Sequence, residues 1–262
     1  MKFRAAVATA AAVPLALGLA ACGGNDKPAA APPAPVSVPT TAEPQKAVST
    51  PPPAVTRLNR VTFVPAMNSA LTKQKSWHVV GKMTGNGSTL MTMDGYQSTN
   101  PNAMSMTMTG AAFQGKSAKI ILVKNTAYLS LPGVTPAGKF AKILPQDAGG
   151  VGELLDSGDP TKIYKSFDKS MVSLKFVGEE TVGGEKLERY AVTVNTAKAL
   201  KFQGKKVPKG IPATLTYAMW MDKSHLVRKL SFNLSGVSMV MTTSDYNKPV
   251  SITAPPASKI VS

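Results

Sequence analysis

The chain has 262 residues, of which 43% are apolar, so it is long enough to bury one sizeable core. It carries 30 basic against 14 acidic side chains, and the resulting formal net charge of +16 favours anionic partners. A single cysteine excludes an internal disulfide framework and any multi-cysteine metal site.

Residues 1–21 have the pattern of a secretory signal peptide, because Lys2 and Arg4 precede an uncharged apolar run that ends in small residues. The run is too short for a comfortable transmembrane span. The stretch Leu19-Ala20-Ala21-Cys22 resembles a bacterial lipobox, which implies attachment of a diacylglyceryl group to Cys22 and cleavage just before it. The alternative is an ordinary signal peptide whose cleavage leaves a free thiol. The lipobox predicts a secreted protein that is lipid-anchored to the outer face of the cell membrane.

Residues 22–56 are predicted to be a disordered tether that follows the lipidated Cys22. The segment is rich in proline and alanine, and it has too few large apolar residues to form a core. Proline at this density favours an extended spacer of roughly 3 Å per residue, which could reach on the order of 100 Å. Such a tether would let a folded domain stand away from the membrane.

The segment from Phe63 to Lys75 is predicted to be a helix, with Phe63, Met67, Ala70 and Leu71 on one face. Alternating apolar and polar residues then predict five strands, at residues 77–84, 89–94, 103–109, 118–124 and 126–131. Between residues 145 and 170 the strand period disappears. Apolar spacing there predicts two short helices, the second of which starts at Asp159-Pro160.

The C-terminal third, residues 172–253, reads as a nearly unbroken antiparallel meander. Five runs alternate with a period of two, in residues 172–176, 190–194, 214–221, 226–234 and 237–241. Turn residues such as Gly183-Gly184 and Ser235-Gly236 separate several of these runs, and residues 196–202 are predicted to be a helical turn or a loop. The pattern predicts one α+β domain, residues 57–262, built on a large curved antiparallel sheet.

Thirteen methionines are present, and most fall in or beside the predicted strands. Methionine is flexible and polarisable, and it accumulates on surfaces that accept varied apolar partners. One hypothesis is therefore a cavity wall for acyl chains, and the alternative is an ordinary core. A thioether copper site is disfavoured, because no histidine or cysteine lies among the methionines. Alternation alone selects these cavity-lining residues: Met91, Met93, Met104, Met106, Met108, Val192, Val194, Leu215, Tyr217, Met219, Leu230, Phe232, Met239 and Met241.

Sequence motifs for catalysis are nearly absent. One turn contains Asp222, Ser224 and His225, the residue types of a catalytic triad. Residues of a single turn rarely place the nucleophile, the base and the residue that orients the base in line. An exposed hairpin turn is therefore the simpler interpretation. We expect no catalytic residue, cofactor or metal, and a monomer.

The surplus of lysines has several candidate partners. The secreted location and the lack of recognition motifs argue against nucleic acid. Anionic phospholipid headgroups or phosphate-bearing wall polymers remain candidates, beside a generally basic solvated surface.

The segments Phe176–Glu185, Tyr190–Val194, Leu215–Asp222 and Leu226–Lys229 carry a resemblance to the actinobacterial LolA-like lipoproteins of the LppX/LprG group. The similarity covers roughly residues 58–256 as a pattern of strands and turns. It implies a half-barrel of antiparallel strands, with helices over its concave face and a hydrophobic cavity between them. It also implies binding of acylated lipids or glycolipids and their movement across the cell envelope.

We therefore expect a membrane-anchored lipoprotein that shields acyl chains in a methionine-rich cavity, with basic residues receiving an anionic headgroup. The alternative is a surface interaction or sensory module, with a dry core and a basic binding face. An esterase would need a nucleophile that the sequence does not reveal.

Overall fold

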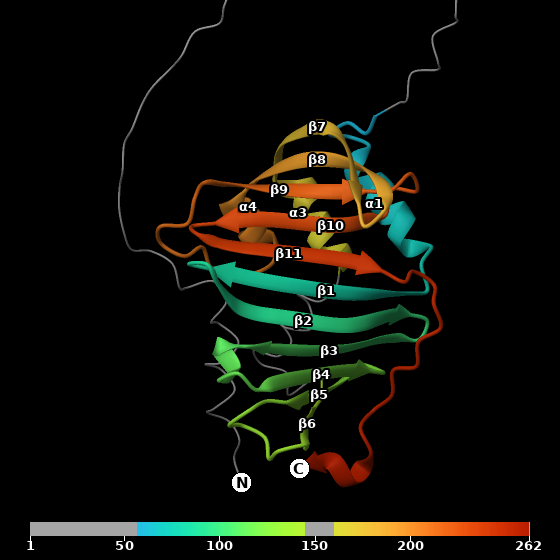
Figure 1. Cartoon of the computed structure of the whole chain (residues 1–262), viewed down its shortest axis with the longest axis vertical. Helices are drawn as coiled ribbons and strands as arrows, with labels where there is room; N and C mark the ends of the chain where they lie inside the picture. The colour runs from blue at the N-terminus through green and yellow to red at the C-terminus, as the bar shows by residue number, and fades with distance from the viewer. Residues whose placement is uncertain (1–56, 145–159, 262) are drawn as a thin grey trace, which may run out of the picture. The chain divides into compact units, whose positions relative to one another are not determined.

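In the computed structural model, residues 57–144 and 160–261 are described, and they form three α-helices and a 12-stranded sheet (Figure 1). The helices are α1 (Phe63–Thr72), α3 (Pro160–Ser170) and α4 (Thr196–Phe202), with short 3-10 turns η2 (Ala111–Phe113) and η4 (Ala257–Lys259). The strands are β1 (Ser76–Gly85), β2 (Ser88–Thr99), β3 (Asn102–Gly110), β4 (Ser117–Val123), β5 (Thr126–Ser130), β6 (Phe140–Ile143), β7 (Met171–Val182), β8 (Glu185–Asn195), β9 (Thr214–Met221), β10 (Val227–Leu234), β11 (Val237–Ser244) and β12 (Ile260–Val261).

The strand order is β12-β6-β5-β4-β3-β2-β1-β11-β10-β9-β8-β7. Every neighbouring pair is antiparallel except β12 with β6. The two meanders meet where β1 pairs with β11, so the first and last long strands lie side by side at the centre of the sheet (Figure 1). The α+β class with a large antiparallel sheet is therefore confirmed.

Tight turns set the register of the hairpins. Asn86-Gly87, Lys124-Asn125, Gly183-Gly184 and Ser235-Gly236 each place two consecutive residues at positive φ. Two such residues are the mark of the type I′ turn, whose twist matches that of the strands it joins. Glycine and asparagine at these positions predict the turns. Lys124 also adopts a positive φ, of 49°, although it is neither glycine nor asparagine.

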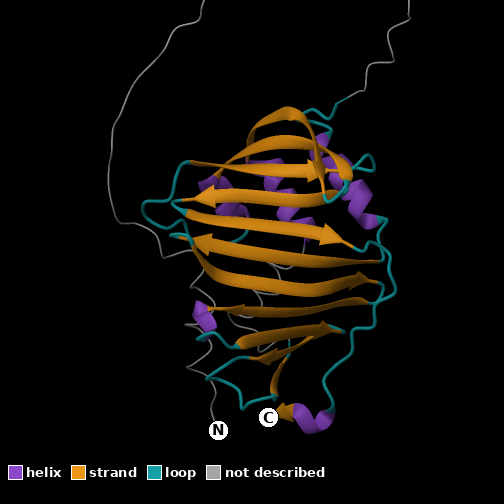
Figure 2. Cartoon of the chain, in the orientation of Figure 1, coloured by secondary structure: helices purple, strands orange, loops and turns teal. Residues whose placement is uncertain are grey.

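The three helices cover one face of the sheet along β7 to β10 (Figure 2). Phe63, Val64 and Met67 of α1 and Phe167 of α3 pack there in the largest buried cluster. The periodicity of α1 correctly predicts its buried face, although the helix ends at Thr72 and not at Lys75. The partly buried Ala199 brings α4 against the same cluster.

Several predictions need correction. Six strands precede residue 145 instead of five, because β6, which lies between β5 and β12, is short and alternates weakly; β12 is a further strand that the pattern does not predict. Alternation places Val172 on the same face as Leu174, but a bulge between Met171 and Ser173 leaves Val172 48% exposed. A second bulge lies between residues 227 and 229. It places the side chain of Val227 in the main core, on the face opposite to the predicted one. The first of the two short helices predicted between residues 145 and 170 lies outside the described residues.

Candidate functional site

The register brings the residues selected by alternation onto one face of the sheet. Leu230 of β10 pairs with both Met219 and Met241, and Met93 of β2 pairs with Met108 of β3. Gly81 of β1 joins these two groups, because it pairs with Met241 on one side and Met93 on the other. A parallel row contains Tyr217, Phe232, Met239, Met83 and Met91. Val192 and Val194, which pair with Tyr217 and Leu215, and the β3 residues Met104 and Met106 extend the face.

Along β7 to β10 this face is a buried, helix-covered core. Val192 and Met219 are fully buried, Val194 is 1% exposed, and all three belong to the cluster that includes α1 and α3. Leu215 is buried in the same cluster, and Leu230 and Phe232 pack against it while partly buried. These residues contact protein side chains, as the interaction-module alternative expects of a core.

Aromatic contacts reinforce the packing of this half. The ring of Phe167 meets Tyr217 edge-on at 5.0 Å between centroids, and Tyr217 meets Phe232 at 5.2 Å. Phe63 lies 5.2 Å from Tyr190 in a tilted arrangement. Burial raises the pKa of Tyr217 to about 12, because the ionised phenolate would lose its hydration.

The face changes character over β11 and β1 to β3. Met91, Met93, Met106, Met108 and Met241 are half-buried, and they are called the methionine strip below. Met106 and Met241 touch the buried Leu71–Trp77–Val79 cluster, and Met108 packs beside Met104 and Ile120. Of the buried clusters formed by residues 57–144 and 160–261, none includes Met91 or Met93.

The methionine strip can offer apolar, adaptable contact and little else. Its five side chains come from three strands, and thioethers accept only weak hydrogen bonds. One such weak contact lies beside the strip, where the side-chain amide of Gln97 donates to the sulfur of Met104 at 3.5 Å. Alkyl chains suit such a surface, because they gain about 25 cal/mol for each Å² of apolar area that leaves water. That these residues line a ligand cavity remains a prediction.

A separate pocket of about 360 Å³ lies between α1 and the turn after β9. None of the predicted lining residues borders it. The residues that do are Ala66, Ser69, Ala70, Lys73, Gln74, Ser224 and His225.

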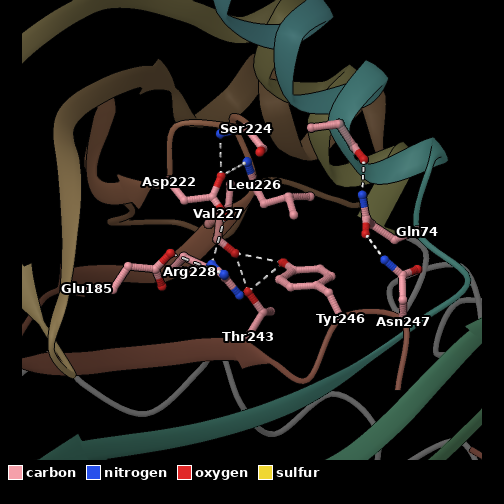
Figure 3. Close-up of polar contacts among 11 residues, drawn as sticks. Gln74, Glu185, Asp222, Ser224, Leu226, Val227, Arg228, Thr243, Tyr246 and Asn247 are labelled. Atoms are coloured by element: carbon pink, nitrogen blue, oxygen red, sulfur yellow. Dashed lines mark hydrogen bonds and ion pairs between the residues drawn. The ribbon is translucent and has the colours of Figure 1, made fainter. Parts of the chain in front are cut away.

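The turn beside this pocket does not assemble a triad, because its carboxylate is engaged by backbone N–H groups and by Arg228 (Figure 3). The carboxylate of Asp222 accepts hydrogen bonds from the backbone N–H of Ser224 at 2.8 Å and of Leu226 at 3.0 Å, and it pairs with Arg228 at 2.9 Å. His225 itself sits at φ 64°, in the left-handed region. Asp222 therefore organises the turn, as the hairpin interpretation expects.

Two further findings concern the described part of the chain. None of its helices is long and apolar enough to cross a membrane. Within it, no three or more histidine, cysteine, aspartate or glutamate side chains gather as they would around a metal ion.

Comparison with known proteins gives the fold. No family model and no curated protein sequence matches the chain. The crystal structure of the Mycobacterium tuberculosis lipoprotein LppX is similar with a TM-score of 0.54 and 18% identity, covering 74% of this chain and 98% of that one. LprF from Mycobacterium bovis is similar with a TM-score of 0.52 and 15% identity, over 75% of this chain and 96% of that one. The LolA-like half-barrel expected from the sequence is thus confirmed as the fold.

Proposed function

We propose that this protein is a cell-envelope lipoprotein of the LppX/LprG kind that binds acylated lipid or glycolipid on its apolar sheet face. Residues 1–21 would be its signal peptide, residues 22–56 its tether and Cys22 its diacylglyceryl anchor on the outer face of the membrane. The fold shared with the lipoprotein LppX supports this proposal. No step of it requires catalysis or a cofactor.

One observation carries the proposal. The apolar face continues from the helix-covered core onto the methionine strip, where the side chains are only half-buried. A core has no need of such a surface, whereas a carrier needs apolar area that an acyl chain can cover. The buried half would hold the fold rigid, and the strip would receive the acyl chains.

The test is to purify the mature chain, starting at residue 22 and carrying Cys22→Ser, from an actinobacterial host. Native mass spectrometry and organic extraction then identify what accompanies it. We expect a stoichiometric diacyl lipid or glycolipid. A clean apo mass, together with no uptake of added phospholipid or glycolipid, would leave the interaction module as the better description.

A matched pair of variants assigns the bound lipid to the strip. Met91→Gln with Met93→Gln makes the strip polar, and we expect it to lose most of the lipid. Val80→Gln with Val240→Gln makes the same change on exposed neighbouring positions of β1 and β11 whose side chains point to the opposite face. The second pair should keep its lipid. Equal loss from both pairs would contradict the assignment.

A further inference from the structure

Lysines gather at one end of the helical layer. Helix α4 and the loop after it, residues 196–213, contain five lysines and no acidic residue: Lys198, Lys201, Lys205, Lys206 and Lys209. All are exposed except the half-buried Lys205, and none forms an ion pair with another described residue. We call these five residues the basic rim.

Helix α3 adds to this charge. The loop is held to α3 by a hydrogen bond from the side-chain amide of Gln203 to the hydroxyl of Ser166, at 3.2 Å. Lys165 and Lys169 of α3 are exposed, and the acidic side chain on that helix, Asp168, lies 3.7 Å from Lys169. The α3–α4 end therefore carries a strong positive charge with one close counter-charge.

Two large apolar side chains stand exposed among the lysines. Phe202, the last residue of α4, is 47% exposed, and Val207 is 38% exposed. Ala199, by contrast, packs against the main cluster, and Lys201 lies on the side of α4 away from it, since two residues advance the helix by about 200°. Lysines around an exposed aromatic residue on an amphipathic helix are typical of a segment that lies at a membrane interface. A soluble polyanion would need the charges but not the apolar side chains.

We propose that the basic rim docks on an anionic phospholipid bilayer, with Phe202 entering the interface and the lysines contacting headgroup phosphates. This proposal rests on one part of the proposed function, the lipid anchor: Cys22 would keep the domain near a membrane. Docking would present the helical layer, and not the opposite sheet face, to the bilayer. The two proposals therefore belong together but can fail separately.

The test is vesicle co-sedimentation of the Cys22→Ser mature chain. Vesicles of phosphatidylcholine mixed with phosphatidylglycerol should bind the protein, and vesicles of phosphatidylcholine alone should not. Each lysine near an anionic surface contributes about 1 kcal/mol, so Lys201→Gln, Lys205→Gln and Lys206→Gln together should weaken binding by about a hundredfold. Binding should also fall as salt is added.

A second triple variant controls for net charge. Lys116→Gln, Lys119→Gln and Lys142→Gln remove the same charge from exposed positions at or beside β4 and β6, far from β8 in the strand order. This variant should bind vesicles within about twofold of the unchanged chain, since interactions beyond a Debye length are screened. Equal weakening by both triple variants, or none by the first, would overturn the proposal.

Phe202→Ser separates a bilayer from a soluble polyanion. We expect it to weaken vesicle binding several-fold while leaving the binding of inorganic polyphosphate unchanged. If it alters neither, while the rim lysines are needed for both, the rim is a site for anionic polymers and the membrane proposal is wrong. Lipid extraction from the rim triple variant should match the unchanged chain, so a failure of docking is distinguishable from a failure of lipid binding.

Discussion

The side chain of Met93 occupies the space that a side chain at Gly81 would need. A Cβ atom at position 81 would lie 2.5 Å from the Cγ of Met93 and 2.8 Å from its sulfur. Gly81 lies between Met93 and Met241 in the sheet, and both methionine side chains approach the space that its missing side chain leaves open. A glycine that weakens a central strand is here part of the apolar face.

Gly81→Ala should therefore force Met93 out of its position. We expect a loss of about 1–3 kcal/mol in the free energy of unfolding, measured in urea, because overpacking costs that much. The double variant Gly81→Ala with Met93→Ala should recover part of the loss, since the two residues are in contact and their effects are not additive. Additive effects would show that Met93 does not fill this space.

The two halves of the apolar face should differ in their response to truncation. Met219 is fully buried in the helix-covered core, so Met219→Ala should cost about 2–5 kcal/mol of unfolding free energy. Met91 is half-buried outside the buried clusters, so Met91→Ala should cost less than about 1 kcal/mol. Urea unfolding of both variants measures the difference. Similar costs would mean that the strip is packed like the core.

Periodicity is enough to predict the α+β class, the turns and the shared face of the methionines. It fails where a bulge breaks the period, at Val172 and Val227, because one extra residue reverses the face of the residues after it. Periodicity also cannot show which part of the apolar face is the buried core and which part is the methionine strip. That division depends on where α1 and α3 pack, a long-range contact that alternation within a strand does not encode.

The pocket beside Ser224 and the basic rim are two further features that sequence periodicity alone does not predict. The sequence shows lysines in residues 198–209, but only the structure shows that Phe202 is exposed among them. The pocket joins Lys73 to His225 across more than half of the chain, and no local pattern predicts their meeting.

Glu180 should titrate at unusually low pH. The indole N–H of Trp220 donates to its carboxylate at 2.7 Å and lowers its pKa, and a hydrogen bond from Arg189 at 2.7 Å lowers it further. A depressed folded-state pKa contributes stability that is present above the unfolded pKa and is lost as the pH falls through the folded value. An NMR titration should place the pKa of Glu180 below that of an ordinary glutamate, and Trp220→Phe should move it back upward. A midpoint that Trp220→Phe does not move would contradict the assigned cause.

The turn after β9 should depend on the charge and shape of Asp222, which is 8% exposed. Asp222→Ala removes the acceptor of two backbone N–H groups and leaves Arg228 without this partner, although Glu185 still lies 3.2 Å from it. We expect a loss of about 3–6 kcal/mol in urea unfolding, since each of the two hydrogen bonds to the charged carboxylate contributes about 1.5–3 kcal/mol.

Asp222→Asn is the matched control, because an asparagine oxygen can still accept both backbone hydrogen bonds but carries no charge for Arg228. It should cost less than half as much as Asp222→Ala. Neither variant should change lipid binding, because Asp222 lies in the turn and not on the apolar face. If Asp222→Asn were as damaging as Asp222→Ala, the ion pair with Arg228 would outweigh the backbone contacts, and the turn would be held mainly by charge.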